Sequence, residues 1–139
     1  MQLEFFMPMV PPTATHQEQK VRIVRRGSMM VPQYYDPPEL ADARAKLTAH
    51  LAAHRPERPL AGPVGLTVKW CFPVGNNHQN GEWRITPPDT DNLQKLLKDC
   101  MTATGFWKDD AQVCWDVCGK AWAEPPGIYI AAIELQGGG

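Results

Sequence analysis

Two pairs of aspartates flank one apolar-striped segment in the second half of the chain. Asp89 and Asp91 stand two residues apart where a polar loop ends, and Asp109 and Asp110 follow the far end of the segment. Carboxylates at a loop-to-helix junction can converge, because the chain is still extended there and a helix N-terminus favours negative charge. Carboxylate oxygens without nearby His or Cys suit Mg²⁺, or Mn²⁺ as its substitute. The acids therefore indicate a divalent-cation site.

Each acid also has a simpler structural explanation. Asp91 can serve as a helix N-cap, and its four-residue spacing from Lys95 is that of an ordinary surface ion pair. Asp109 and Asp110 can form a solvated turn. These explanations predict no dependence on a metal.

A distance argument limits how the acids can meet. A helix over residues 91–104 rises about 20 Å, and residues 105–110 can return at most about 20 Å when fully extended. Asp110 therefore reaches Asp89 and Asp91 in one of three ways. The 105–110 segment runs back along the helix, the helix ends early, or a second subunit supplies Asp110.

The elements that must position these acids are predicted from apolar spacing. Alternation predicts strands, and apolar residues every three to four positions predict helices. The expected strands cover residues 1–10, 20–24, 64–72, 113–123 and 127–135, and the expected helices run from Pro37-Pro38 to near His54 and from Asp91 to Thr104. They predict one α+β domain over residues 1–136, a mixed β-sheet of about five strands with two main helices packed on it, and a disordered tail over 137–139.

The connections carry two further expectations. The last two strands should form an antiparallel hairpin around Glu124-Pro125-Pro126, with the final strand central in the sheet because both of its faces are apolar. Residues 74–88 form a long polar loop, and loops of this length inside a domain are usually functional.

Composition excludes several classes of protein. The chain has 139 residues, and its 14 Lys and Arg against 15 Asp and Glu give a net charge of −1, which excludes a uniformly basic nucleic-acid-coating protein. No apolar run is long enough for a membrane span, and no signal peptide is visible, so we expect a cytoplasmic protein without membrane contact. Four cysteines without a CxxC pair predict reduced, half-buried thiols instead of disulfides or a zinc site.

A cationic stretch covers residues 20–26, KVRIVRR. Apolar and basic residues alternate there, which predicts a strand with Val21 and Ile23 on the core face and a cationic opposite face. Arg25-Arg26-Gly27 is typical of a turn. The stretch is either a solvated strand edge or a stripe that follows phosphates.

Residues 88–113, PDTDNLQKLLKDCMTATGFWKDDAQV, closely resemble the signature of the RusA family of crossover-junction endodeoxyribonucleases. That signature runs Asp-x-Asp-Asn-Leu, then Lys, then Gly and a terminal Asp-Asp-x-Gln. Weaker similarity extends to PPTATHQEQKVRI near the start, to Tyr34-Tyr35 and to Lys120.

The resemblance implies a homodimeric, Mg²⁺-dependent nuclease that resolves four-way (Holliday) junctions by paired phosphodiester hydrolysis in recombination and repair. It implies branched DNA as substrate and no organic cofactor. By position, the metal-binding catalytic carboxylates are those of Asp89, Asp91 and Asp110, and Lys95 is the essential basic residue. The DNA-binding candidates are Lys20, Arg22, Arg25, Arg26, Arg84 and Lys120.

Two other functions remain open at this point. One is a related phage-type nuclease that acts on other branched DNA with the same metal site. The other is a non-catalytic DNA-binding module whose acids only cap a helix. Trp83 in the 74–88 loop either stacks on an unpaired base or packs on the domain, whereas Trp107 is expected in the core.

Overall fold

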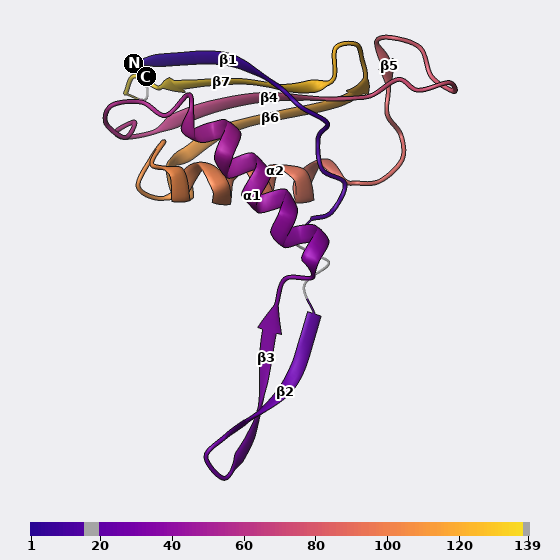
Figure 1. Ribbon diagram of the computed structural model, residues 1–139. Coiled ribbons are helices and arrows are strands. Elements are labelled where there is room, and N and C mark those ends of the chain that lie inside the picture. Colours follow the sequence, from indigo (N-terminus) through magenta and orange to yellow (C-terminus); the bar gives the residue numbers. More distant parts are fainter. Residues whose placement is uncertain (16–19, 138–139) are drawn as a thin grey trace.

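The computed structural model describes residues 1–15 and 20–137, with Lys20 through its backbone alone. A five-stranded mixed sheet forms the body (Figure 1). Its strands are β1 (Gln2–Pro8), β4 (Val64–Phe72), β5 (Glu82–Trp83), β6 (Val113–Trp122) and β7 (Gly127–Glu134), in the order β1-β7-β4-β6-β5. Strands β4 and β6 are parallel, and the other neighbours are antiparallel.

Two helices, α1 (Pro38–Ala52) and α2 (Thr90–Thr104), cover one face of the sheet (Figure 1). Proline at the first helical position suits the start of α1, because its fixed φ is helical and its missing N–H has no partner there in any case. Gly105, with φ of 95°, ends α2 in the left-handed conformation that a glycine adopts without strain. The sheet and the two helices confirm the predicted α+β class.

The core lies between this sheet face and the helices. Alternate residues of β4, including Leu66, Val68 and Trp70, are fully or almost fully buried against the apolar stripe of α2. Burial of such a side chain stabilises the fold by roughly 1.5–3 kcal/mol. The opposite sheet face carries exposed apolar residues, among them Trp115, which is 63% exposed. In the part of the chain that the structure describes, no helix is both long and apolar enough to cross a membrane.

The predicted hairpin between the last two strands is wrong. Strands β6 and β7 both pair with β4, which lies between them, and β7 also pairs with β1. The connection passes over the end of β4, where the Ala123 N–H donates to the Phe72 carbonyl at 2.8 Å. Strand β4 is buried along most of its length, so both of its edges need hydrogen-bond partners. The expectation that the last strand is internal is confirmed.

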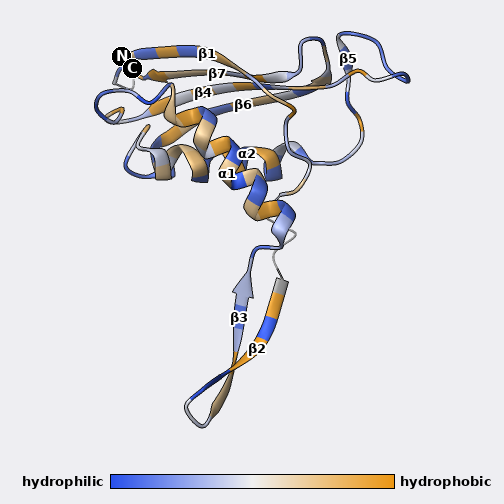
Figure 2. Ribbon diagram, viewed as in Figure 1, coloured by the Kyte–Doolittle hydropathy of each residue, from blue (hydrophilic) through white to orange (hydrophobic). Residues whose placement is uncertain are grey.

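A second, two-stranded sheet projects away from the body (Figure 1). It pairs β2 (Lys20–Arg26) with β3 (Met29–Tyr35), and Gly27, with φ of 63°, lies in the turn. Sequence analysis was wrong to place Val21 and Ile23 in the core: they are 52% and 61% exposed. Hydrophobic and hydrophilic residues alternate along β2 in Figure 2, but no helix or second sheet of the described residues covers the hydrophobic face of this two-stranded ribbon.

Two smaller expectations also change. Arg25 and Arg26 belong to β2 and precede the turn, and strand β3 was not predicted because its MMVPQYY sequence contains a proline and lacks alternation. Of the predicted tail, Gly137 is exposed and outside any helix or strand, and residues 138–139 lie outside the described residues.

Candidate active site

Asp89 and Asp91 lie at the start of α2, where sequence analysis placed them. Asp89 is the N-cap residue, with extended backbone (φ −76°, ψ 150°), and its carbonyl accepts the Leu93 N–H at 3.0 Å. Its carboxylate makes no capping hydrogen bond. Both carboxylates are exposed and have no protein partner among the described residues. The first hydrogen bond of the helix thus uses only backbone atoms of Asp89. The two carboxylates remain free to bind a cation.

Asp110 lies at the opposite end of α2. Strand β6 runs back along the helix: Asp116 contacts Lys98, and Cys118 contacts Thr90 farther toward the helix start. Asp110 comes six residues before Asp116, in a 3-10 helix over Asp110–Gln112, so it lies beyond the C-terminal end of α2. The chain brings Asp89 and Asp91 together but does not bring Asp110 to them.

Asp109 and Gln112 explain why this acidic turn stays at that end. The Asp109 carboxylate accepts the Ala111 N–H at 2.8 Å and caps the 3-10 helix. The Gln112 amide donates to the carbonyls of Leu60 and Gly62, at 3.1 and 3.0 Å, which ties the turn to the segment before β4. Within residues 1–15 and 20–137, no three His, Cys, Asp or Glu side chains lie close enough to hold a metal ion.

Lys95 is 56% exposed and lies one helical turn after Asp91. Its ammonium pairs with Asp99 at 3.5 Å, not with Asp91, so the surface pair that the sequence suggested as an alternative does not form. A long, exposed ion pair of this kind contributes less than about 1 kcal/mol. Lys95 can therefore leave Asp99 for a phosphate at small cost.

A groove of about 360 Å³ separates the first half of α2 from β6. Asp116 lies in it and accepts hydrogen bonds from Gln94 at 2.6 Å and Lys98 at 2.9 Å. Gln94 is buried and accepts the Trp70 indole N–H at 3.3 Å. The groove is lined by Thr90, Asp91, Gln94, Lys98, Asp116 and Cys118.

Sequence analysis missed Asp116 as part of the site. Its signal was a single acid inside an otherwise apolar strand, VCWDVC. Burial raises the pKa of the Cys118 thiol, on the same strand, to about 11.

The four cysteines are free, and their environments differ. Cys71 and Cys100 are buried and Cys118 is half-buried, as expected, but Cys114 is exposed. Cys114 lies near the start of β6, where the pairing with β4 is irregular, whereas Cys100 lies on the buried face of α2.

The hairpin cations lie apart from the acids. Arg22 donates to Gln33 at 2.8 Å and lies over the Tyr35 ring at 5.1 Å, whereas Arg25 and Arg26 are exposed and have no partner among the described residues. The side chain of Lys20 lies outside what the structure describes. Residues 20–35 contain no Asp or Glu, so the whole ribbon is cationic.

Arg84 and Lys120 lie close to Asp89, but they contact the protein itself. Lys120 donates to the carbonyls of Thr86 and Pro88, and Arg84 donates to that of Pro87. Trp83 is 65% exposed, with the Lys69 ammonium 5.6 Å from its ring centre, so it is available for stacking. Trp107 is buried and donates to Thr102, which confirms its predicted core position.

Comparisons with known proteins identify the family. The family model described as endodeoxyribonuclease RusA matches residues 9–133. The crossover junction endodeoxyribonuclease rusA of Lactococcus phage r1t is 27% identical over 137 residues, which cover 97% of this chain and 100% of the relative. The uncharacterized protein YqaN of Bacillus subtilis (strain 168) is 30% identical over 94 residues, which cover 60% of this chain and 66% of the relative.

Proposed function

Since the chain belongs to the RusA family of endodeoxyribonucleases, we propose that it resolves four-way DNA junctions by Mg²⁺-dependent hydrolysis of paired phosphodiester bonds. The name of the phage relative supports a crossover junction as substrate. The observation that carries the proposal is the pair of free carboxylates, Asp89 and Asp91, at the start of α2. We further propose that the protein acts on this substrate in recombination and repair, in the cytoplasm.

The donor set fits Mg²⁺. This ion is usually held by one or two carboxylates together with substrate phosphates and water, and it prefers oxygen ligands. Asp89 and Asp91 provide two such carboxylates without competing protein partners. A bound Mg²⁺ would supply Lewis-acid stabilisation of phosphate charge and a lower pKa for the attacking water.

The residues of the chain have separate tasks in this reaction. Asp89 and Asp91 hold the cation beside the scissile phosphate, at a helix N-terminus whose dipole also favours anionic groups. Lys95 lies one turn farther along α2 and stabilises the charge that develops on the phosphate or on the leaving 3′ oxygen. No organic cofactor is needed.

Asp110 takes part only if a second copy of the chain supplies it. In one chain it lies beyond the other end of α2 from Asp89 and Asp91. In a two-fold symmetric dimer each copy could bring Asp110 to the acids of the other, which would form two equivalent sites. Two sites related by symmetry also match the two cuts that resolve a junction. We therefore propose a homodimer with sites shared between the copies.

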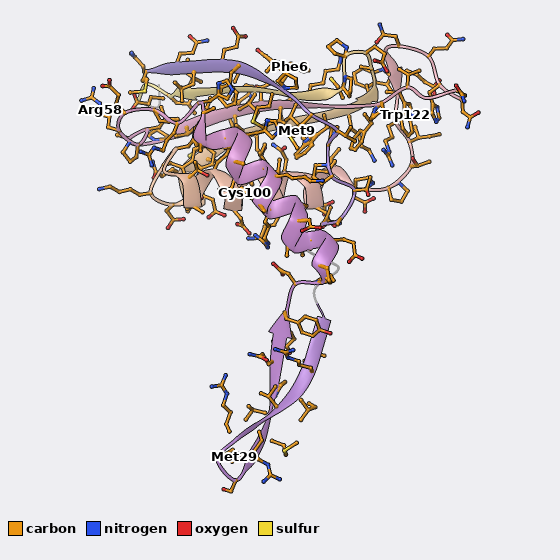
Figure 3. All side chains as sticks on the ribbon, viewed as in Figure 1. Phe6, Met9, Met29, Arg58, Cys100 and Trp122 are labelled. Carbon is orange, nitrogen blue, oxygen red and sulfur yellow. The ribbon has the colours of Figure 1, made fainter. Side chains whose placement is uncertain are left out.

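The hairpin of β2 and β3 is the proposed DNA contact away from the acids. A two-stranded ribbon fits the major groove of DNA, and Lys and Arg side chains neutralise phosphates. Strand β2 carries Arg22, Arg25 and Arg26. Met29, which is labelled in Figure 3, lies at the far end of the ribbon. The ribbon therefore extends the contact well beyond the scissile phosphates.

The test is cleavage of a synthetic four-way junction, with a linear duplex of the same sequence as control. We expect symmetric paired nicks in the junction, no cutting of the duplex, and no cutting in EDTA. Asp89→Asn should abolish cutting and keep or improve junction binding, because it removes negative charge near the phosphates. Lys46→Met, on exposed α1 surface, is the control variant with one charge changed.

Other outcomes would decide for the other functions. Cutting of forks or flaps, but not of four-way junctions, would establish the nuclease of other branched DNA. Binding without cutting at any Mg²⁺ or Mn²⁺ concentration would establish the non-catalytic module. Loss of both binding and cutting in a folded Asp89→Asn protein would overturn the role assigned to this residue.

A further inference from the structure

Two positively charged side chains, those of Lys120 and Arg84, donate hydrogen bonds to residues 86–88, the segment before Asp89. The Lys120 ammonium donates to the Thr86 carbonyl at 2.8 Å and to the Pro88 carbonyl at 2.7 Å. The Arg84 guanidinium donates to the Pro87 carbonyl between them, and its Nε donates to the Thr86 hydroxyl at 3.2 Å. Three successive carbonyls thus accept hydrogen bonds from positively charged side chains.

This segment has few other means of being fixed. Pro87 and Pro88 have no N–H, so they cannot donate to a strand or a turn. Their carbonyls are the main-chain groups available, and hydrogen bonds from charged donors are about twice as strong as neutral ones. Lys120 and Arg84 therefore supply the anchoring that backbone pairing supplies elsewhere.

The two cations are themselves held in place. The Arg84 guanidinium lies over the rings of both Phe72 and Trp122, 4.3 and 4.4 Å from their centres. The Arg84 N–H donates to the Lys120 carbonyl at 3.2 Å, so the two residues are also joined through the backbone. Trp122 lies at the end of β6, and its label in Figure 3 is on the body of the protein, far from the hairpin. Arg84 and Lys120 are thus held in place by the sheet.

Side chains of strand β6 contact α2 as well as the 86–88 segment. Asp116, Cys118 and Lys120 alternate along one face of β6, opposite Leu66, Val68 and Trp70 of β4. Asp116 is bonded to Gln94 and Lys98, the Cys118 thiol lies 3.9 Å from the Thr90 carbonyl, and Lys120 reaches the 86–88 segment. Successive side chains of one strand therefore contact the middle of α2, its first residue and the segment before it.

We propose that Arg84 and Lys120 are positioning residues, which fix the 86–88 segment and thereby the two carboxylates at the start of α2. They act through the backbone of this segment instead of binding DNA phosphates. The proposal rests on the proposed function, because the carboxylates are positioned for the divalent cation that this function requires. Two of the three Lys120 donors are already used on carbonyls, which leaves little of this side chain for a phosphate.

The experiment compares Lys120→Met, Lys120→Arg, Arg84→Gln and the control Lys46→Met with the unaltered protein. Mn²⁺ binding to the protein without DNA is followed by electron paramagnetic resonance of free Mn²⁺. The Mg²⁺ concentration for half-maximal junction cleavage and the junction Kd in EDTA are measured in parallel. Amide hydrogen exchange is recorded at residues 93–95 in the first turn of α2, where the Leu93 N–H donates to the Asp89 carbonyl at 3.0 Å.

For Lys120→Met and Arg84→Gln we expect about a tenfold weaker Mn²⁺ affinity and a similar rise in the half-maximal Mg²⁺ concentration, as is typical when the support of a metal ligand is lost. Exchange at residues 93–95 should be faster, and the junction Kd in EDTA should match that of Lys46→Met. Lys120→Arg should recover part of the Mn²⁺ affinity, because it keeps donors for the carbonyls.

The opposite pattern would overturn the proposal: a weaker junction Kd in EDTA with unchanged Mn²⁺ affinity and unchanged exchange would make both residues DNA ligands. If Lys120→Met does not fold, as judged by circular dichroism, Arg84→Gln and Lys120→Arg decide the question by the same measurements. Failure of the proposed function gives a different result, because the unaltered protein itself would then lack Mg²⁺-dependent cleavage, whereas exchange at residues 93–95 would still report the anchoring.

Discussion

The Gln94 amide donates to Asp116 across the groove between α2 and β6, at 2.6 Å, and its oxygen accepts the Trp70 indole N–H at 3.3 Å. One buried side chain thus joins the central strand β4, the helix α2 that begins next to the acids, and the strand β6 that carries Lys120. It fixes the rotation of α2 on the sheet. The faces on which Asp91 and Lys95 lie are set by this contact as well as by apolar packing.

Gln94→Leu should therefore destabilise the protein although leucine has nearly the same size. The Trp70 indole N–H is fully buried and would lose its oxygen acceptor, keeping only the weakly accepting Cys118 sulfur, which costs about 1–3 kcal/mol. The free energy of unfolding in urea measures this change. Lys98→Met removes only a partly exposed ion pair with Asp116 and should cost at most about 1 kcal/mol. Equal losses in the two variants would contradict the role given to Gln94.

Mixing two inactive variants tests the shared site. The proposed function predicts that an Asp89→Asn chain and an Asp110→Asn chain are each inactive on their own. If the second copy supplies Asp110, a mixed dimer contains one site with both changes and one intact site. After unfolding and refolding of an equal mixture, about a quarter of the sites should nick a junction. One variant is labelled with ¹⁵N, so that native mass spectrometry identifies the mixed dimers; no recovery with mixed dimers present would place all three acids of a site in one chain.

The hairpin arginines should set the salt dependence of binding. Arg25→Gln and Arg26→Gln should each reduce the slope of log Kd against log salt concentration by about 1 and weaken binding to all DNA sequences alike. The metal requirement should not change, because neither residue contacts α2. Arg58→Gln is the control, since Arg58 is an exposed cation at the end of the body opposite the hairpin (Figure 3). An unchanged slope in both hairpin variants would exclude the ribbon from the DNA contact.

The cysteines should react in the order of their exposure. Burial raises the pKa of Cys118 to about 11 and also raises the pKa values of Cys71 and Cys100, whereas Cys114 is exposed. A raised pKa keeps a thiol protonated at pH values where an ordinary thiol ionises, and only the thiolate is alkylated readily. At pH 8 to 9, iodoacetamide should modify Cys114 first, as shown by peptide mass spectrometry. Comparable rates at Cys118 would contradict its burial.

Local pattern was enough for most of the elements. Alternation in VGLTVKWCF matches β4, and the apolar stripe from Leu93 to Met101 lies within α2 and predicted its buried face. Pairing was harder to predict, because alternation shows which face of a strand is buried but not which strand lies beside it. The expected β6–β7 hairpin failed for this reason, since the strongly apolar β4 takes the place between them.

In the hairpin of β2 and β3, alternation also failed to predict which residues are buried. Val21 and Ile23 have the spacing of a core strand, but no second layer covers them. A strand face is buried only if another element packs on it, and both helices pack on the main sheet. Only the structure could show that this apolar face and its arginines lie outside the body.

The sequence by itself determined the family and predicted the acids and their chemistry, because carboxylates at fixed spacing around an amphipathic helix are readable without coordinates. The tertiary structure decided where these acids lie. The length of α2 separates Asp110 from Asp89 and Asp91, and the direction of β6 brings Asp116 and Lys120 to the helix in its place. Such contacts join residues that are distant along the chain, so no local pattern contains them.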